Sequence, residues 1–326
     1  MQTMKRTLLM CLALLAAPTS FAQQPDVWPS RPITMIVPAS AGSGTDILAR
    51  EMARRLGLAL GQSVIVDNKT GGSGVIGTQA VVRSKPDGYT ILYTNGSNTV
   101  MAPALLKTVP YDVVRDLVPV AQTAVGGVLL LVNKDFPAKN LRELVDLVKA
   151  SPGKHTYGSW GVGSSGHLIM EWLKKQTGMQ ISHVPYRQVP QLLTELAAGG
   201  LQIGWADPSS PVSFIESGKV RGIAISGTAH VPRTASIATM GEQGYPFESV
   251  GWFGVFAPPG TPPAIVQRLT AEINKIQKLP ESADKMTALN FEPPPVKTAE
   301  QFGAIVAADL QTWKKLVVDA GITPED

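Results

Sequence analysis

The chain has 326 residues, a formal net charge of +4 and a single cysteine, Cys11. Its lysines and arginines are scattered and form no run, so the charge does not support binding to nucleic acid. One cysteine allows no internal disulfide and no cysteine-based metal site.

The N-terminus has the pattern of a secretory signal peptide, residues 1–22. Lys5 and Arg6 precede an apolar run, and the small residues Ser20 and Ala22 stand at positions −3 and −1 of a cleavage site. We expect a cut after Ala22, which also removes the cysteine, and export to a bacterial periplasm. A chain of roughly 300 residues then suits two domains of about 150 residues each.

A strand, a small-residue loop and a helix open the mature chain. Residues 33–37 are apolar and β-rich, and Leu48, Met52 and Leu56 recur at i+4 in a predicted helix that begins at Ile47. The loop between them is rich in glycine and hydroxyl residues. Such a loop offers free backbone N–H groups at a helix N-terminus, where the dipole favours an anion. An ordinary βα turn fits the same pattern, and both interpretations stay open here.

Strands and helices then alternate along the chain. Further strands are predicted at 64–67, 89–94, 128–132, 156–160, 181–186, 201–205, 220–225 and 252–256. Further helices are predicted at 78–83, 141–150, 167–177, 191–198, 264–276 and 299–320. This alternation predicts parallel sheets with crossover helices, whose ligands bind beyond the C-terminal ends of the strands. We expect the polar loops after the first three strands at that edge, and the last two helices on the first domain.

Gly161, Gly163 and Gly166 match the spacing of a dinucleotide-binding loop. The next predicted strand, 181–186, contains no acidic residue to bind a ribose. We therefore expect a cradle of backbone N–H groups and serine hydroxyls for an anion, and no nucleotide.

The sequence contains no motif that is typical of catalysis or of metal binding. A Gly-x-Ser-x-Gly nucleophile elbow is absent, and no cluster of histidines and acids has metal-ligand spacing. His167 stands at a helix start and is expected to be a structural cap. Trp160 and Trp205 are expected at the ligand edge. For Trp160 two roles stay open, as part of the pocket wall or as part of the core. Trp172 lies in mid-helix and is expected in the core.

Short motifs over the whole mature chain carry a family resemblance. They are Trp28-Pro29-x-Arg31-Pro32-Ile33, Val37-Pro38 with the loop to Asp46, Asp67-Asn68 with Gly74-x-Ile76-Gly77, Pro86-Asp87-Gly88-Tyr89-Thr90, Pro110-Tyr111-Asp112, Tyr157-Gly158-Ser159, His183-Val184-Pro185-Tyr186-Arg187, and Gly251-Trp252-Phe253-Gly254. Together they resemble the solute-binding proteins of tripartite tricarboxylate transporters, the Bug family.

The resemblance implies an α/β, two-lobed periplasmic binding protein fold of type II-like form, with a ligand cleft between the lobes. Two sets of strand, loop and helix predict domain 1 from 23–123 plus 249–326, and domain 2 from 124–248. The expected function is capture of a small organic carboxylate by a monomer that serves membrane permease subunits, without catalysis, cofactor or metal. A periplasmic hydrolase and a ligand sensor that feeds a signalling receptor remain alternatives.

The resemblance also implies that four loops hold the ligand carboxylate through backbone N–H groups, hydroxyls and ordered waters. The candidate ligand-binding residues are Ser40, Ser43, Gly44, Thr45, Asp46, Gly72, Ser73, Asn95, Ser97, Ser159, Trp160, Gly163, Ser164, Ser165, Arg187 and Asp207. The position of Asp46 in the first turn of the helix fits a structural capping role at least as well as contact with the ligand. The indole of Trp160 stands where the family usually has a small polar residue. It favours an aromatic or long-chain carboxylate, or a dicarboxylate, over citrate.

Overall fold

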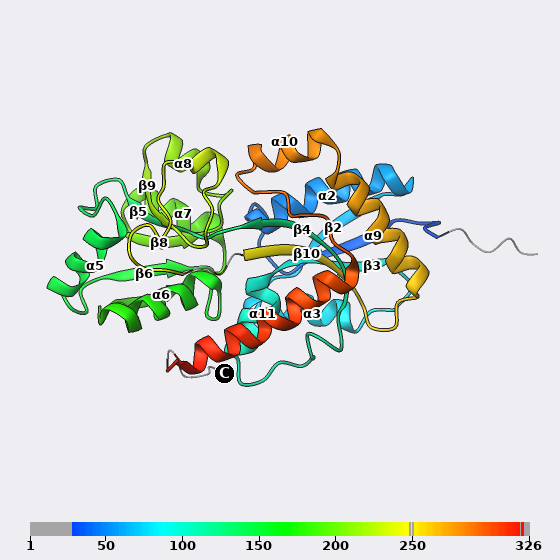
Figure 1. The fold of residues 1–326 in the computed structure, drawn as a ribbon, viewed down its shortest axis with the longest axis horizontal. Helices are drawn as coiled ribbons and strands as arrows, with labels where there is room; N and C mark the ends of the chain where they lie inside the picture. Colours follow the sequence, from blue (N-terminus) through cyan, green and yellow to red (C-terminus); the bar gives the residue numbers. More distant parts are fainter. Residues whose placement is uncertain (1–27, 248, 250, 320, 323–326) are drawn as a thin grey trace, which may run out of the picture.

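The computed structural model describes residues 28–247, 249, 251–319 and 321–322, so the predicted leader lies outside the described residues. Two mixed five-stranded sheets form two lobes that lie side by side in Figure 1. Within the described part of the chain, no helix has the length and apolar character needed to cross a membrane. The predicted two-lobed α/β fold is confirmed.

Lobe 1 is built on the sheet β2-β1-β3-β10-β4. Its strands are β1 (Ile33–Val37), β2 (Val64–Asn68), β3 (Thr90–Asn95), β4 (Val118–Gly126) and β10 (Gly251–Ala257). β1 pairs in parallel with β2 and β3, whereas β10 runs antiparallel between β3 and β4. The helical elements are α2 (Gly44–Leu60), η1 (Gly72–Gly74), α3 (Val75–Val82), η2 (Ser97–Met101), α4 (Ala102–Leu105), α9 (Pro263–Gln277), α10 (Pro280–Ala288) and α11 (Ala299–Asp319).

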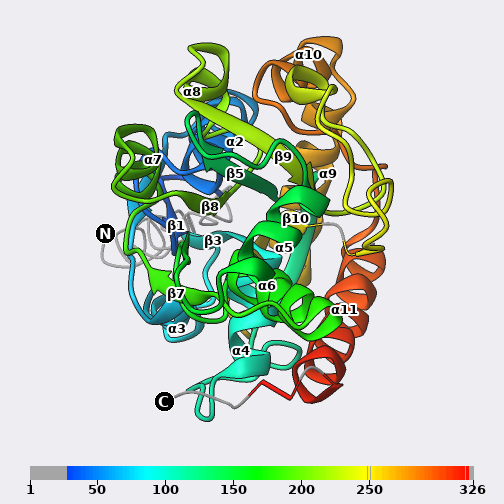
Figure 2. The same ribbon diagram turned by 90° about the vertical axis from the view of Figure 1, so that its left-hand side faces the viewer.

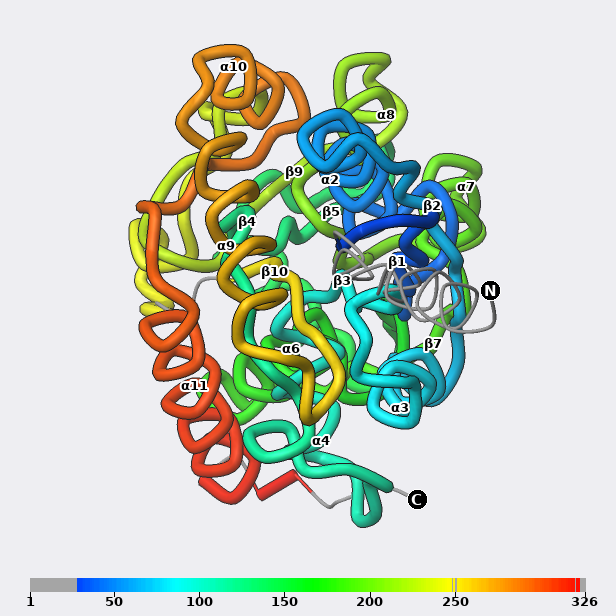
Figure 3. The backbone as a smooth tube through the Cα atoms, turned by 90° about the vertical axis from the view of Figure 1, so that its right-hand side faces the viewer, coloured from blue at the N-terminus to red at the C-terminus, as the bar shows by residue number. Residues whose placement is uncertain are grey.

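The apolar faces of the helices sandwich this sheet. Leu48 of α2 and Leu269 of α9 belong to the core on one face, while Val81 of α3 and Phe302 of α11 belong to the core on the other. Figure 3 faces lobe 1 and shows α9 between α2 and α11. The last long helices pack on the first lobe, as expected.

Lobe 2 repeats the same order with the sheet β7-β6-β8-β5-β9. Its strands are β5 (Leu129–Asn133), β6 (Thr156–Ser159), β7 (Ser182–Pro185), β8 (Ile203–Ala206) and β9 (Val220–Ile225). β6 is parallel to β7 and β8, and β5 is antiparallel to β8 and β9. The helical elements are α5 (Leu141–Ala150), α6 (Ser165–Thr177), α7 (Val189–Ala198), α8 (Val212–Glu216) and η3 (Pro232–Thr234); Figure 2 faces this lobe.

The chain crosses between the lobes twice, once from β4 to β5 and once on the way from β9 to β10. Gly126 at the end of β4 pairs with Gly251 at the start of β10, so the two crossings are adjacent. The predicted boundary between residues 123 and 124 falls inside β4. The division into two domains by residue number remains a prediction.

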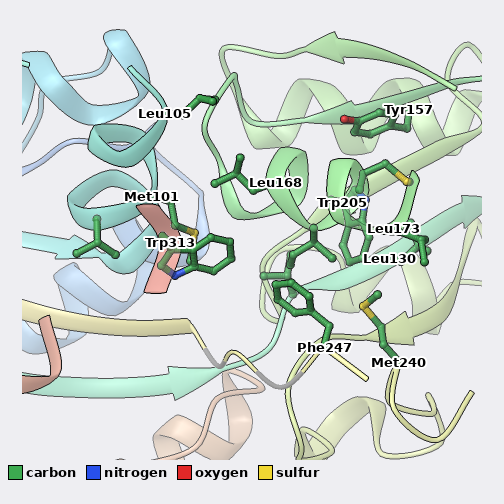
Figure 4. Packing of buried hydrophobic residues seen from close by; sticks show 14 of the residues in the cluster. Met101, Leu105, Leu130, Tyr157, Leu168, Leu173, Trp205, Met240, Phe247 and Trp313 are labelled. Atoms are coloured by element: carbon green, nitrogen blue, oxygen red, sulfur yellow. The ribbon is translucent and has the colours of Figure 1, made fainter. Parts of the chain in front are cut away.

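One apolar cluster extends from lobe 1 into lobe 2 (Figure 4). Met101 and Leu105 come from lobe 1, Leu168 from α6 of lobe 2, and Trp313 from the far end of α11. The ring of Phe247 lies 5.9 Å from that of Trp313, and it also meets Trp172 of α6 edge-on at 5.1 Å. The two lobes therefore share packed apolar surface next to the crossings.

Candidate functional site

A cavity of about 550 Å³ lies between the lobes, within the range of small-molecule sites. Loops that follow β1, β2 and β3 of lobe 1 and β6, β7 and β8 of lobe 2 form its walls. The predicted site residues that line it are Ser40, Ser43, Thr45, Gly72, Ser73, Asn95, Ser97, Trp160, Ser165, Arg187 and Asp207. Among the lining residues in the described ranges, Arg187 and Asp207 alone carry charge.

The other predicted site residues, Gly44, Asp46, Ser159, Gly163 and Ser164, do not line this cavity. The first turn of α2 shows why for Asp46, which is 3% exposed. Its carboxylate accepts hydrogen bonds from the Gly42 N–H at 2.9 Å, from Arg50 Nε at 3.0 Å and from Asn68 Nδ2 at 2.9 Å. Burial raises the pKa of Asp46, but the hydrogen bonds from Arg50, Gly42 and Asn68 outweigh it and hold the pKa below its ordinary value. Asp46 is thus an ionised structural cap.

The first turn of α6 has the same design with a different side chain. Ser164 Oγ accepts from the His167 N–H at 3.3 Å, just as Ser43 Oγ accepts from the Asp46 N–H at 3.4 Å. His167 Nδ1 then accepts from the Gly163 N–H at 3.2 Å. An accepting Nδ1 requires a neutral imidazole with its proton on Nε2. The expectation that His167 is a structural cap agrees with this geometry.

The half-buried His183 and two buried serines complete the polar group under α6. The His183 ring stacks on the His167 ring at 4.4 Å, and its Nε2 lies 2.7 Å from Ser159 Oγ. Ser164 Oγ donates to Ser159 Oγ at 2.9 Å. Burial, followed by the proximity of His167 and Lys174, lowers the pKa of His183 to about 3. Burial also lowers the pKa of His167. Ser159 and Ser164 serve this internal network, away from the cavity.

Trp160 and Trp205 differ in position, although both were expected at the ligand edge. Trp160 lines the cavity, and its Nε1 donates to Ser97 Oγ at 3.3 Å. Trp205 is fully buried under α6, so the prediction that it lies at the ligand edge is wrong. A Cβ on Gly166 would lie 2.6 Å from Trp205 Cβ, which explains the third glycine of the nucleotide-like pattern as a close contact between helix and strand.

Several buried hydroxyl groups at the cavity keep a free proton. Ser97 Oγ accepts from both Trp160 Nε1 and the Ser165 N–H, and Thr45 Oγ1 accepts from Asn95 Nδ2 at 2.8 Å. For the hydroxyl protons of Thr45, Ser97 and Ser165, the structure records no acceptor among the described residues. A hydroxyl whose lone pairs are occupied can still donate, and a carboxylate is a strong acceptor.

The lining also contains apolar side chains that the sequence interpretation did not assign to the site. Among them are Met101, Val128, Pro208, Trp252 and Phe253. Trp252 and Phe253 lie in the quoted Gly251–Gly254 motif, which was the one available signal for them. Elsewhere in the described chain, no group of three or more histidine, cysteine or acidic residues is placed to hold a metal ion.

The two sheets of equal strand order with a cavity between them define a periplasmic binding protein. Residues 48–322 match the family model described as "Tripartite tricarboxylate transporter family receptor". Protein BugT of Bordetella pertussis is 34% identical over 309 residues, 94% of this chain and 93% of that protein. The chain therefore belongs to the tripartite tricarboxylate transporter receptor family, which includes the Bug proteins.

Solved structures agree with this assignment. A protein of R. palustris solved with adipate has a TM-score of 0.88 and 31% identity, with 91% of this chain and 100% of that chain covered. MatC from Rhodopseudomonas palustris with bound malate has a TM-score of 0.84 and 27% identity, with 89% and 100% covered. Periplasmic binding protein BugD has a TM-score of 0.86 and 30% identity, with 91% and 100% covered. These findings support solute binding, and not the hydrolase or sensor alternatives.

Proposed function

We propose that this protein captures one small organic carboxylate between its lobes and delivers it, chemically unchanged, to the permease subunits of a tripartite transporter. The observation that carries the proposal is the set of buried hydroxyl protons of Thr45, Ser97 and Ser165 at one cavity, without acceptors among the described residues. A carboxylate supplies acceptors for donors from both lobes at once. The relatives solved with adipate and malate bind ligands of this class.

The cavity lining favours one or two carboxylates on an apolar body. Arg187 is the single cationic side chain among the described lining residues, so a ligand with three carboxylates would bury uncompensated charge. Trp160, Trp252 and Phe253 offer aromatic surface for the rest of the ligand. Aromatic monocarboxylates and aliphatic dicarboxylates are therefore the expected ligands, ahead of citrate.

Calorimetry with benzoate, adipate and citrate tests the ligand class. The wild type is expected to bind benzoate or adipate more tightly than citrate. Trp160→Ser is expected to weaken benzoate binding by about 0.5–1.5 kcal/mol beyond the loss of buried area. Trp172→Phe, a change in a tryptophan that does not line the cavity, is the matched control. Tightest binding of citrate, or unchanged affinities in Trp160→Ser, would contradict the proposal.

The remaining parts of the proposal have their own measurements. Chromatography of the ligand after binding is expected to recover it unchanged, whereas a hydrolase would consume an ester probe. Mass spectrometry of the exported protein is expected to place its N-terminus at Gln23. Light scattering of the loaded protein is expected to give the mass of a monomer.

A further inference from the structure

Asp207 of lobe 2 reaches across the cavity to the first residue of α2 in lobe 1. Its Oδ2 accepts from the Gly44 N–H at 3.2 Å. Within lobe 2, Oδ1 accepts from the Ser209 and Ser210 N–H groups at 3.0 and 2.9 Å, and Ser210 Oγ donates to Oδ2 at 2.6 Å. The carboxylate is thus held by its own lobe and points its remaining acceptor capacity at the start of a helix in the other lobe.

Ser97 makes the reciprocal contact. It follows β3 in lobe 1, and its Oγ accepts from the N–H of Ser165, the first residue of α6 in lobe 2, at 3.0 Å. β3 and β8 occupy the same third position in their sheets. Each lobe therefore uses a residue that follows the strand in the third position of its sheet to satisfy the first N–H of the site helix in the opposite lobe. Ser97 stands two residues after β3, and Asp207 stands directly after β8.

Gly44 is shaped for this contact. A Cβ at Gly44 would lie 2.2 Å from Asp207 Oδ1 and 2.5 Å from Asp207 Cγ, too close for any side chain. Gly44 is the first helical residue of α2, where alanine is well accepted by the backbone. The glycine is thus required by the approach of Asp207, and not by the conformation of the helix.

We propose that Asp207 and Ser97 are positioning residues that latch the two lobes together, and that Asp207 does not select the ligand. The proposal rests on the proposed function, because it concerns how the same cavity is closed. The N–H groups of Gly44 and Ser165, the first residues of the two helices, are used for closure and do not donate to the ligand. If only the closed form binds, the observed affinity scales with the closed fraction, and loss of a latch weakens every ligand by one common factor.

Amide hydrogen exchange of the ligand-free protein tests the latch without any ligand. Asp207→Ala is expected to accelerate exchange at Gly44 by about tenfold or more, because a hydrogen bond to a charged group is lost. Exchange at Ser165 is expected to accelerate as well, since opening the lobes separates both contacts. Acceleration at Gly44 alone, or at neither amide, would overturn the proposal.

Gly44→Ala is the second variant, because Asp207→Ala also disturbs the turn at Ser209 and Ser210. The added methyl group keeps the Asp207 side chain in the protein but prevents its approach to Gly44, so exchange at Ser165 is again expected to rise. Gly200→Ala, where a Cβ meets nothing closer than 3.8 Å, is the matched control and is expected to match the wild type. Wild-type exchange at Ser165 in Gly44→Ala would refute a shared latch.

Calorimetry with benzoate and adipate then separates the latch from ligand contact. Both Asp207→Ala and Gly44→Ala are expected to weaken the two ligands by the same factor, whereas Trp160→Ser weakens them by different factors. A change for one ligand only would make Asp207 a ligand contact and refute the proposal. If neither ligand binds the wild type, the proposed function fails, but the exchange data still decide whether the latch exists.

Discussion

The first turns of α2 and α6 share a backbone but differ in charge. Each follows a glycine of positive φ, Gly42 at 77° and Gly163 at 74°, and each has a serine cap. In both, the third helical residue reaches back to the N–H of that glycine. In lobe 1 this residue is the ionised Asp46, and in lobe 2 it is the neutral His167. The turn thus requires an acceptor at this position but no charge, and the choice of acceptor sets how each lobe responds to pH.

Replacement of Asp46 should have the largest effect on this comparison. Asp46→Ala removes the acceptor of three hydrogen bonds, two of them from uncharged donors in or near the loop, and is expected to lower the free energy of unfolding by about 3 kcal/mol. Urea unfolding of the ligand-free protein at pH 7.5 measures it. Asp46→Asn keeps one oxygen acceptor and is expected to lose less. An unchanged stability together with a weakened carboxylate affinity would instead make Asp46 a ligand contact.

Acidification should break the equivalence of the two turns. The folded-state pKa of His183 is about 3, below its ordinary value of 6.5, so the unfolded chain binds more protons between those values. The contribution of His183 to the free energy of unfolding is therefore fully present above pH 6.5 and decreases as the pH falls. The loss at pH 5 amounts to about 2 kcal/mol. His167, whose pKa is also lowered, acts in the same direction. Asp46, with a lowered pKa, loses its contribution only below about pH 4.

His183→Phe serves as the control for this pH dependence. Phenylalanine keeps a ring beside His167 and Tyr157, which stack on His183 at 4.4 and 4.9 Å, and it has no proton to gain. Denaturant unfolding at pH 7.5 and pH 5 is expected to show a smaller difference in this variant than in the wild type. Equal differences in the two proteins would assign the pH dependence to other groups.

Removal of the serine caps should have the smallest effect and should show that the two turns are alike. Ser43→Ala and Ser164→Ala each remove one N-cap acceptor and are expected to lower the free energy of unfolding by about 1 kcal/mol. Thermal unfolding of the two variants measures this. Carboxylate affinity in Ser164→Ala is expected to match the wild type, because Ser164 does not line the cavity. If Ser164→Ala bound carboxylates more weakly while its stability was unchanged, Ser164 would be a ligand contact.

Local periodicity predicted most of the strands and long helices. It failed where strand pairing or helix capping determines whether an element forms or where it begins. α2 begins at Gly44 and not at Ile47, because Ser43 is the cap and the polar residues after it are already helical. β4 was not predicted, since it is held by its antiparallel partner β10, which lies more than a hundred residues away in sequence. Such pairings leave no short-range pattern.

For the site, the rule that ligands bind beyond the C-terminal ends of strands located the correct loops. It did not say which side chain of a loop faces the cavity. Ser164 and Ser165 are neighbours, yet Ser164 caps α6 and Ser165 lines the cavity. Likewise, the contact of Asp207 with Gly44 joins residues 163 positions apart and depends on how the two lobes meet. That information lies in the packing between lobes, beyond any local motif.

The insertion of β10 between β3 and β4 has a consequence for the order of folding. β10 begins at Gly251, so a chain synthesised or exported from its N-terminus presents β3 and β4 long before the strand that separates them. The strands of lobe 2 all lie between Leu129 and Ile225, and that sheet can form without waiting. Lobe 2 is therefore expected to complete its sheet first, and lobe 1 to close only after the return crossing. Lobe 1 therefore cannot complete its sheet until β10, which begins at residue 251 of 326, is available.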